Sequence, residues 1–295
     1  MNDPSPASQS DAVQSDFATS VQWRMAHDRN PLFPLLQDKL AVKGYARERG
    51  VASADVFAVI SDPALVPRQQ FPDTCFVKAN HGCGWNFLRE KGVFYYFGNG
   101  NELMNADGSL NDATRRRLHV PHDQVVQMCM QMFSLRYCME EWAYQMIRPQ
   151  IFIEEKLLSA EGGELLDYRF YTFDGVVKAI NVGSATYRRK QENVFLTPDW
   201  QVIAMTQPRE GLPNPLPKRP EQLPAMISAA ERLGSDIDFV RIDLYQSTKG
   251  VMLGEMTLYP NGGAPRTPSG CPRFDQWLGQ QWRRPEMPTV ARRAE

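Results

Sequence analysis

Two segments near the C-terminus alternate between apolar and polar residues, which is the pattern of strands buried on one face. The first segment, residues 239–245, places its apolar and polar side chains on opposite faces: Val240, Ile242 and Leu244 against Arg241, Asp243 and Tyr245. In the second, residues 252–257, the same period places Glu255 and Thr257 on one face with Leu253. The connection between them is short and ends at Gly250, so we expect a β-hairpin.

This hairpin brings Asp243, Glu255 and Arg241 onto one surface. The two carboxylates are hard oxygen ligands, and an arginine beside them is a fixed cation. The combination suits Mg²⁺ that bridges the phosphates of a nucleotide. The alternative is a solvated hairpin face with a salt bridge.

The rest of the chain divides into a helical first part and a mainly β second part. Helical patterns cover residues 22–50 and 112–144, and shorter helices are expected at 223–233 and 274–282. We expect a hairpin at 87–96 and strands at 55–60, 75–79, 151–158, 166–173, 176–182 and 199–203. Helices followed by mostly antiparallel strands predict an α+β fold with two lobes.

Lys78 stands on an apolar strand directly before a loop with two glycines, Gly82 and Gly84. A lysine followed by exposed backbone N–H groups suits the capture of phosphate. The loop is neither a Walker A sequence nor a dinucleotide fingerprint, and a plain turn is the alternative. His81, in the same loop, is either a base or anion contact, or a residue that hydrogen-bonds within the loop.

The strand at 151–158 contains Glu154, Glu155 and Leu157 near its end. Backbone groups left unpaired where the strand stops can bind the edge of an adenine ring, with Leu157 or Leu158 beneath the ring. Asp167, after the next turn, can accept a hydrogen bond from a ribose hydroxyl. The alternative is a strand end with solvated charges.

The composition limits the classes of partner and the compartment that we expect for the protein. The 295 residues include 33 Lys and Arg against 34 Asp and Glu, a formal charge of −1, so no basic field attracts nucleic acid. The five cysteines show no Cys-x-x-Cys spacing, which indicates reduced thiols in a cytoplasmic protein. No run of about 18 apolar residues occurs, so we expect no membrane span.

Taken together, these segments resemble the ATP-grasp superfamily, and more closely its teichuronopeptide-biosynthesis (TupA-like) branch. The matching stretches, in family order, are 28–32, 38–43, 76–86, 153–157, 167–170, 239–245 and 254–258. The resemblance implies an ATP-grasp fold, in which two α+β lobes enclose ATP.

The resemblance also implies which residues bind ATP. Lys78 and Lys39 match lysines that contact phosphate, and Arg241 matches an arginine that faces the transferred phosphate. The other positions match the adenine hinge and the ribose contact: Glu154, Glu155 and Leu157 for the hinge, and Asp167 for the ribose.

The implied metal site consists of Asp243 and Glu255, which match the two carboxylates that hold Mg²⁺. Thr257 stands where the superfamily often has Asn, so its hydroxyl is either a weak metal ligand or the mark of an altered second site. The basic run at residues 188–190 either closes over phosphate or forms a solvated loop.

The resemblance and the composition together predict the domain boundaries. We expect a disordered segment at 1–16, a region preceding the ATP-grasp lobes at 17–70, a small lobe at 71–150, a C-terminal lobe with the metal site at 151–282 and a flexible tail at 283–295.

The activity implied is that of a carboxylate–amine ligase, which uses a small-molecule carboxylate, an amine and ATP. The carboxylate attacks the γ-phosphate, and the amine then displaces phosphate from the acyl phosphate. The branch implies joining an amino acid or small acid to a peptide or cell-surface glycan precursor. The alternatives are a kinase for a small molecule or glycan and a nucleotide-binding scaffold without catalysis. Lids that exclude water are expected at 80–86 and 184–193.

Overall fold

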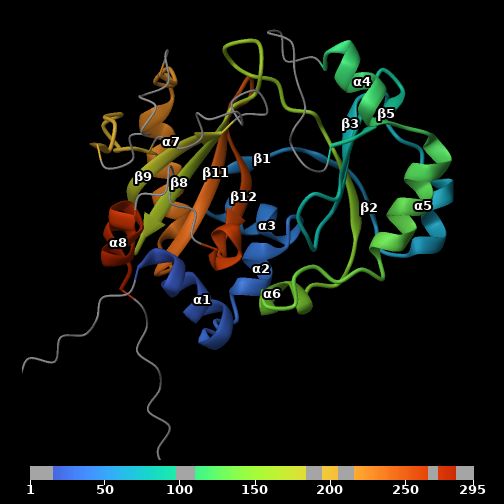
Figure 1. The fold of residues 1–295 in the computed structure, drawn as a ribbon. Coiled ribbons are helices and arrows are strands. Elements are labelled where there is room, and N and C mark those ends of the chain that lie inside the picture. Colours follow the sequence, from blue (N-terminus) through green and yellow to red (C-terminus); the bar gives the residue numbers. More distant parts are fainter. Residues whose placement is uncertain (1–15, 98–109, 184–194, 205–215, 265–271, 284–295) are drawn as a thin grey trace, which may run out of the picture.

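The computed structural model describes residues 16–97, 110–183, 195–204, 216–264 and 272–283. Two six-stranded sheets organise the fold, and Figure 1 shows sheet A on the left and sheet B on the right. The expected terminal segments therefore lie outside the described residues, apart from Asp16, which caps the first helix, and Arg283.

Sheet A has the strand order β1-β12-β11-β8-β9-β10, and only its β1–β12 pair is parallel. Its strands are β1 (Ala52–Ser53), β8 (Asp167–Phe173), β9 (Val176–Gly183), β10 (Phe195–Leu196), β11 (Phe239–Ser247) and β12 (Gly250–Thr257). The amphipathic helix α7 (Leu223–Gly234) packs its apolar side against one face of this sheet. Much of the main hydrophobic core lies there, whereas the other face carries aromatic residues such as Phe239 and Tyr171 at one end and the polar residues of the hairpin farther along.

Sheet B has the order β2-β7-β3-β4-β5-β6, and all of its pairs are antiparallel. Its strands are β2 (Val56–Ile60), β3 (Cys75–Ala79), β4 (Asn86–Glu90), β5 (Val93–Tyr96), β6 (His119–Val120) and β7 (Ile151–Glu154). Helix α5 (His122–Met132) and the 3₁₀ helix η1 (Pro63–Arg68) cover its second core, and α4 (Asp112–Leu118) lies at β5.

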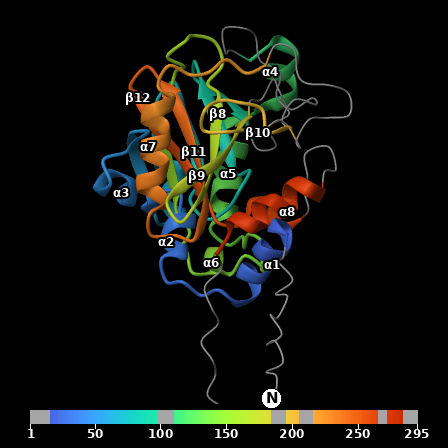
Figure 2. The ribbon, with the colours of Figure 1, turned by 90° about the vertical axis from the view of Figure 1, so that its left-hand side faces the viewer.

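Short helices close one end of sheet A. They are α1 (Phe17–His27), α2 (Phe33–Gln37), α3 (Ala41–Glu48), α6 (Trp142–Gln145), the 3₁₀ helix η3 (Pro260–Gly263) and α8 (Pro272–Gln281). Figure 2 shows α1 and α8 packed side by side. Arg24 anchors α1, because its buried guanidinium pairs with Asp238 and donates to the backbone oxygen of Phe239 at 2.7 Å.

Most of the expected elements are confirmed, and several boundaries differ. The strand expected at 151–158 ends at Glu154. In place of the strand expected at 199–203, β10 precedes a turn at Trp200, whose φ is 66°, and Val202 forms only an isolated bridge with Leu196. A positive φ interrupts an extended chain, so this prediction is wrong. The region 112–144 holds α4, α5 and α6 but also the two-residue strand β6.

A β-bulge in the C-terminal hairpin changes which face of the sheet some side chains of β12 point to. Asp243 pairs with Glu255, but the next residue, Leu244, pairs with Leu253, so Gly254 is the extra residue. Leu253 therefore follows Leu244 into the core and does not share the face of Glu255, which corrects the sequence prediction. A Cβ at Gly254 would lie 2.7 Å from the ring of Tyr245, which explains the glycine.

The sheets do not follow the expected lobe boundary at residue 150. Strand β7 begins the expected C-terminal lobe, yet it pairs with β3 and β2 in sheet B. Its side chains are buried on both faces, as in a central strand. Because β7 hydrogen-bonds to neighbours far away in sequence, chain order does not reveal its sheet. Within the described ranges, no helix combines the length and apolar character needed to cross a membrane.

Candidate nucleotide and metal site

The polar face of sheet A carries a row of charged residues on neighbouring strands. Asn181, Arg169, Asp243 and Glu255 are direct cross-strand partners from β9 to β12. Partners in register point to the same face, so their side chains lie side by side. The hairpin prediction is thus confirmed for Asp243 and Glu255, and the register adds Arg169, which the sequence reasoning missed.

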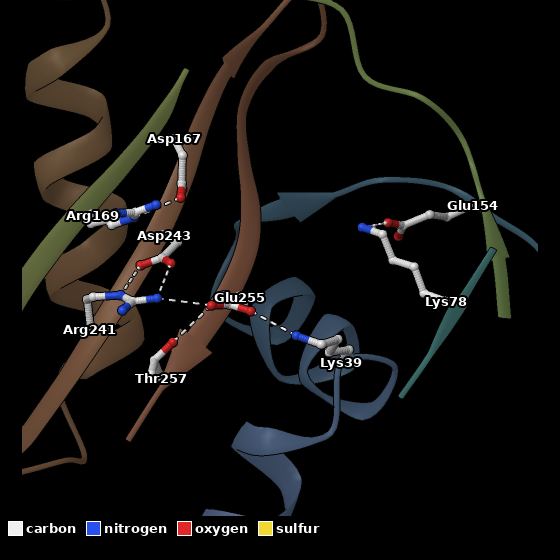
Figure 3. A network of polar contacts seen from close by, with 9 residues as sticks. All are labelled: Lys39, Lys78, Glu154, Asp167, Arg169, Arg241, Asp243, Glu255 and Thr257. Carbon is white, nitrogen blue, oxygen red and sulfur yellow. Dashed lines mark hydrogen bonds and ion pairs between the residues drawn. The ribbon is translucent and has the colours of Figure 1, made fainter. Parts of the chain in front are cut away.

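Arg241 connects the two carboxylates of this row. Its Nε lies 2.7 Å from Oδ1 of Asp243 and its Nη2 lies 2.6 Å from Oδ2, a bidentate pair. The same Nη2 lies 3.0 Å from Oε1 of Glu255 (Figure 3). A planar guanidinium bound at three points is held in one orientation, so the structure confirms the fixed cation expected on this surface.

Lys39 and Thr257 complete the surroundings of Glu255. The Nζ of Lys39 lies 2.8 Å from Oε2, and the hydroxyl of Thr257 donates to Oε1 at 3.1 Å. Lys39 stands between α2 and α3, where its backbone N–H donates to the oxygen of Asn80 at 3.1 Å. The amide of Asn80 in turn donates to Asp38 at 3.0 Å. The N-terminal helices and the loop after β3 therefore position Lys39 together.

Burial and neighbouring charges shift the pKa values of Asp243, Glu255 and Lys39. Burial raises the pKa of Asp243 to about 7; Arg241 opposes this rise, and the negative charges of Asp167 and Glu255 add to it. The Lys39 ammonium holds the pKa of Glu255 far below its usual range. Burial opposes the charge of Lys39, but Glu255 raises its pKa to about 12. The cations Arg169, Arg241 and Lys39 thus stand against the carboxylates of Asp167, Asp243 and Glu255, and the raised pKa of Asp243 reflects mainly its burial.

The residues present fit a magnesium ion that shares its coordination with phosphate. Asp243, Glu255 and Thr257 offer hard oxygens on adjacent strands. One oxygen of Asp167, Oδ1, is buried without a hydrogen-bond partner. In the part of the chain that the structure describes, no group of three or more His, Cys, Asp and Glu forms a complete metal site. The remaining ligands would therefore come from phosphate or water.

A second charged cluster lies on sheet B. The Glu154 carboxylate is buried between Lys78, at 2.5 Å, and Lys43, at 2.8 Å. Figure 3 shows the Lys78–Glu154 pair facing the carboxylates of sheet A from the other sheet. Lys43 was included in the sequence analysis only within the matching stretch 38–43. Its contact with Glu154 depends on the packing of α3, which the sequence does not show.

Tyr245 connects the two clusters electrostatically. Burial raises the pKa of its hydroxyl well above the usual value, and the carboxylates of Asp167, Glu255, Asp243 and Glu154 act in the same direction. Carboxylates of both sheets therefore contribute to the raised pKa of Tyr245: those of the row on sheet A and Glu154 on sheet B. The predicted phosphate lysine thus lies on sheet B and is turned toward the predicted metal carboxylates of sheet A (Figure 3).

At the expected adenine hinge, the glutamate side chains do not lie where the prediction placed them. Glu155 faces away from the charged row, since Lys249 binds its Oε2 at 2.6 Å and the Asp55 N–H donates to its Oε1 at 2.9 Å. Within the described ranges, the backbone groups of Lys156 and half-buried Leu157 have no backbone partner after β7 ends. The backbone, not the glutamate side chains, is thus available to a ring edge.

The loop at 80–86 is held by internal contacts. The two ring nitrogens of buried His81 lie 3.1 Å from Asn80 Oδ1 and 2.9 Å from the Met132 oxygen, and burial lowers its pKa. The neutral ring donates its single N–H to one of these oxygens, and these contacts favour the loop-bonding role for His81 over catalysis. Gly84 has a φ of 78°, and a Cβ at Gly82 would lie 2.8 Å from the ring of Trp85.

Other expected residues are placed as follows. Asp167 accepts from Arg169 at 2.9 Å, beside the charged row and not apart from it. The basic run at 188–190 and the lid at 184–193 lie outside the described residues. The four cysteines that the structure describes are free thiols. The sequence did contain a signal for Arg169. It lies two residues after Asp167 on an expected strand, so strand alternation places both side chains on the same face.

A small cavity of about 20 Å³ lies at one end of sheet A. It is lined by residues of α1, β8, β10, η3 and α8, among them Tyr171, Phe195, Asn261 and Asp275. Of these, Tyr171 is the cross-strand partner of Arg241. The cavity contains none of the predicted nucleotide or metal residues, so it is separate from the charged clusters.

Comparison with known proteins now adds to this geometry. A family model described as TupA-like ATPgrasp matches residues 19–283. No match is found among the curated proteins.

Several solved structures are similar to this chain at low identity. D-alanine–D-alanine ligase from Helicobacter pylori is 13% identical with a TM-score of 0.43, and the match covers 84% of this chain and 62% of that one. A RiPP-associated ATP-grasp ligase from Chryseobacterium gregarium, in complex with ADP and a leader and core peptide, is 10% identical with a TM-score of 0.40, covering 86% and 61%. The chain thus spans about six tenths of the length of these proteins.

Proposed function

The chain belongs to the TupA-like ATP-grasp family, and on that premise we propose that it is an ATP-dependent carboxylate–amine ligase. Its fold is the ATP-grasp fold, with one charged cluster on each sheet. The observation that carries the proposal is Arg241, which is bound to both Asp243 and Glu255 and faces Lys78 on the other sheet.

In the proposed complex the triphosphate of ATP lies between the two clusters. Lys78 and Lys39 balance the negative charge of its phosphates, and Arg241 donates to the phosphoryl group that is transferred. Asp243 and Glu255 would hold Mg²⁺, with Thr257 beside them. When bound, Mg²⁺ neutralises charge on the phosphate oxygens. The unpaired backbone groups of Lys156 and Leu157 support adenine binding at the end of β7.

The chain's own residues then position the first substrate. A carboxylate oxygen attacks the γ-phosphorus, the bond to the β-phosphate oxygen breaks, and ADP leaves with that electron pair. Arg241 and Lys39 stabilise the charge that develops during the transfer. The acyl phosphate passes its acyl group to an amine. We propose an amino acid or small acid as the carboxylate and a peptide or cell-surface glycan precursor as the acceptor, in the cytoplasm, where ATP is supplied.

The first test is binding of Mg-ATP, measured as thermal stabilisation. A ligand at 100 times its Kd stabilises the folded state by about 2.7 kcal/mol. Lys78→Ala and Glu255→Ala should reduce the shift, whereas Lys218→Ala, at an exposed position, should not. Absence of any shift at saturating nucleotide would contradict the proposal.

The second test is turnover. ADP release should depend on a carboxylate when pools of amino acids and small acids are supplied, and an amide product should require an amine. ADP formed with phosphate transferred to a hydroxyl would instead identify a kinase. Amide formation that persists in both Lys78→Ala and Glu255→Ala would exclude the assigned site.

A further inference from the structure

Lys43 is a half-buried lysine to which the proposed function gives no role. It lies in α3, at the end of the matching stretch 38–43, and its side chain is 15% exposed. Its ammonium group donates to the backbone oxygen of Ala54 at 3.0 Å and pairs with Oε2 of Glu154 at 2.8 Å. Withdrawing a charge from water costs free energy unless it is paired, so this placement requires an explanation.

Glu154 is shared between Lys43 and a second lysine. Its other oxygen, Oε1, lies 2.5 Å from the ammonium group of Lys78, and the glutamate is only 5% exposed. Lys78 on β3 is the cross-strand partner of Phe152, two residues before Glu154 on β7, so both charged side chains point to the same face of sheet B. Burial would raise the pKa of Glu154, but the two lysines hold it below its usual range. Glu154 is therefore a carboxylate.

This cluster holds more positive than negative charge. Two ammonium groups and one carboxylate give a net charge of +1. The carboxylates of Asp55 and Glu155 do not change this balance by pairing, because both are bound to the exposed ammonium group of Lys249. Among the residues that the structure describes, no second carboxylate pairs with either lysine of the cluster.

The excess charge is available at Lys78. Lys43 uses its ammonium group for Ala54 and Glu154, whereas Lys78 has only Glu154 as an ion-pair partner within the described ranges. An ammonium group has three donors, so Lys78 keeps two of them, and its side chain is 26% exposed. Figure 3 shows this ammonium group turned toward the carboxylates of sheet A.

We propose that Lys43 is a positioning residue for nucleotide binding. It balances the charge of Glu154, so that Glu154 fixes the Lys78 side chain without cancelling the charge that Lys78 presents to the triphosphate. Without Lys43, Glu154 and Lys78 would form a neutral pair, which attracts an anion much less than a net charge does. The inference rests on the proposed function, in which Lys78 binds phosphate, and it adds a residue that acts through two others.

Two other roles for Lys43 are direct contact with phosphate and support of α3 alone. A pair of variants separates them from the proposed role. Lys43→Met lowers the net charge of the cluster to zero, and adding Glu154→Gln returns it to +1, now carried by Lys78 alone. The amide that replaces the carboxylate keeps an oxygen that can accept a hydrogen bond from Lys78. Only the proposed role predicts that the second substitution repairs the first.

The test is calorimetric titration of the full chain with Mg-ATP. The proteins are the wild type, Lys43→Met, the double variant Lys43→Met with Glu154→Gln, and Lys218→Met as the control. Lys218 also pairs with a glutamate, Glu161, but its side chain is 70% exposed. The melting temperature of each protein without nucleotide is measured as well. If Lys43→Met does not fold, Lys43→Gln takes its place, because the glutamine amide carries no charge and can still donate hydrogen bonds.

The expected result is a loss that the second substitution reverses. Weakening of one charged hydrogen bond between Lys78 and phosphate predicts that Lys43→Met binds Mg-ATP at least about tenfold more weakly than the wild type. The double variant should recover most of this loss, although it lacks both native side chains. Lys218→Met should bind as the wild type does. A role confined to α3 would lower the melting temperature of both Lys43 variants and would leave the double variant without any recovery.

Two outcomes would overturn the inference: wild-type affinity in Lys43→Met, or a double variant that binds Mg-ATP no better than Lys43→Met. If the wild type binds Mg-ATP and Lys78→Ala weakens that binding in those cases, the proposed function stands and only the role of Lys43 is wrong. If the wild type does not bind Mg-ATP, the proposed function itself is excluded.

Discussion

The ammonium group of Lys39 lies 2.8 Å from the carboxylate of Glu255, although 216 positions separate the two residues in the chain. Lys39 belongs to the N-terminal helical segment, and Glu255 lies on β12 of sheet A. The backbone of Lys39 also binds Asn80, which follows β3 of sheet B. One residue therefore connects three separate segments at the place where the family is expected to bind phosphate.

Replacing Lys39 should reduce nucleotide use without unfolding the protein. In Lys39→Ala, Glu255 keeps its contacts with Arg241 and Thr257, so the fold should persist. Loss of one charged hydrogen bond to phosphate predicts Mg-ATP binding or turnover about 10- to 100-fold weaker. The measurement is nucleotide titration followed by calorimetry, with Lys218→Ala as the control. Wild-type affinity in Lys39→Ala would show that its ammonium serves only Glu255.

The bulge at Gly254 should not tolerate a side chain. Gly254→Ala places a methyl group 2.7 Å from the Tyr245 ring, and overpacking typically costs about 1 to 3 kcal/mol. Because Tyr245 borders both charged clusters, nucleotide binding should weaken as well. Denaturant unfolding measures the first effect, and the double variant Gly254→Ala with Tyr245→Ala should recover part of the loss.

A glycine without such a neighbour should behave in the opposite way. Gly44 lies in α3 with no atom within 4 Å of where its Cβ would stand. Gly44→Ala should therefore stabilise the protein by about 0.5 to 1 kcal/mol, because alanine restricts the unfolded chain and favours helix. Destabilisation of this variant would mean that the surroundings of α3 are more crowded than described.

Arg24 should be among the most sensitive positions for stability. Its guanidinium is fully buried, pairs with Asp238 and Asp28, and lies 4.4 Å from the centre of the Trp282 ring. Removing one partner of a buried ion pair typically costs about 3 to 5 kcal/mol, so Arg24→Met should lower the unfolding free energy by that amount. Arg29→Met, at an exposed position on the same segment, should change it by less than about 0.5 kcal/mol. Equal effects of the two substitutions would contradict the assignment.

Asp275 should make stability depend on pH between about 4 and 6. Burial raises its pKa from 3.8 to about 6, and Asp16 adds to the rise. The folded state thus binds this proton more tightly than the unfolded state, so the favourable contribution is complete below about pH 4 and is lost as the pH rises to about 6.

Asp275→Asn cannot ionise, so it should remove the decrease in unfolding free energy that Asp275 causes as the pH rises. Its amide oxygen can still accept a hydrogen bond from the backbone N–H of Ala18. Compared with the wild type, the variant should gain up to about 3 kcal/mol between pH 4 and pH 7. Urea unfolding at several pH values measures the difference, with Asp199→Asn as an exposed control. A difference that does not change with pH would show that Asp275 titrates normally.

The sequence by itself determined the local elements and the face that most side chains adopt. Alternation along 239–245 requires Arg241 and Asp243 to share a surface, because successive residues of a strand point to opposite sides. The strand at 75–79 and the helix at 223–233 follow from similar short-range patterns and agree with the structure. The family model matches residues 19–283, which include these segments.

Only the tertiary structure decided which of these segments meet. The bulge at Gly254 turns Leu253 into the core, β7 joins sheet B, and Lys39 reaches Glu255 across most of the chain. Such contacts depend on register and on packing between distant segments, and local periodicity carries no information about either.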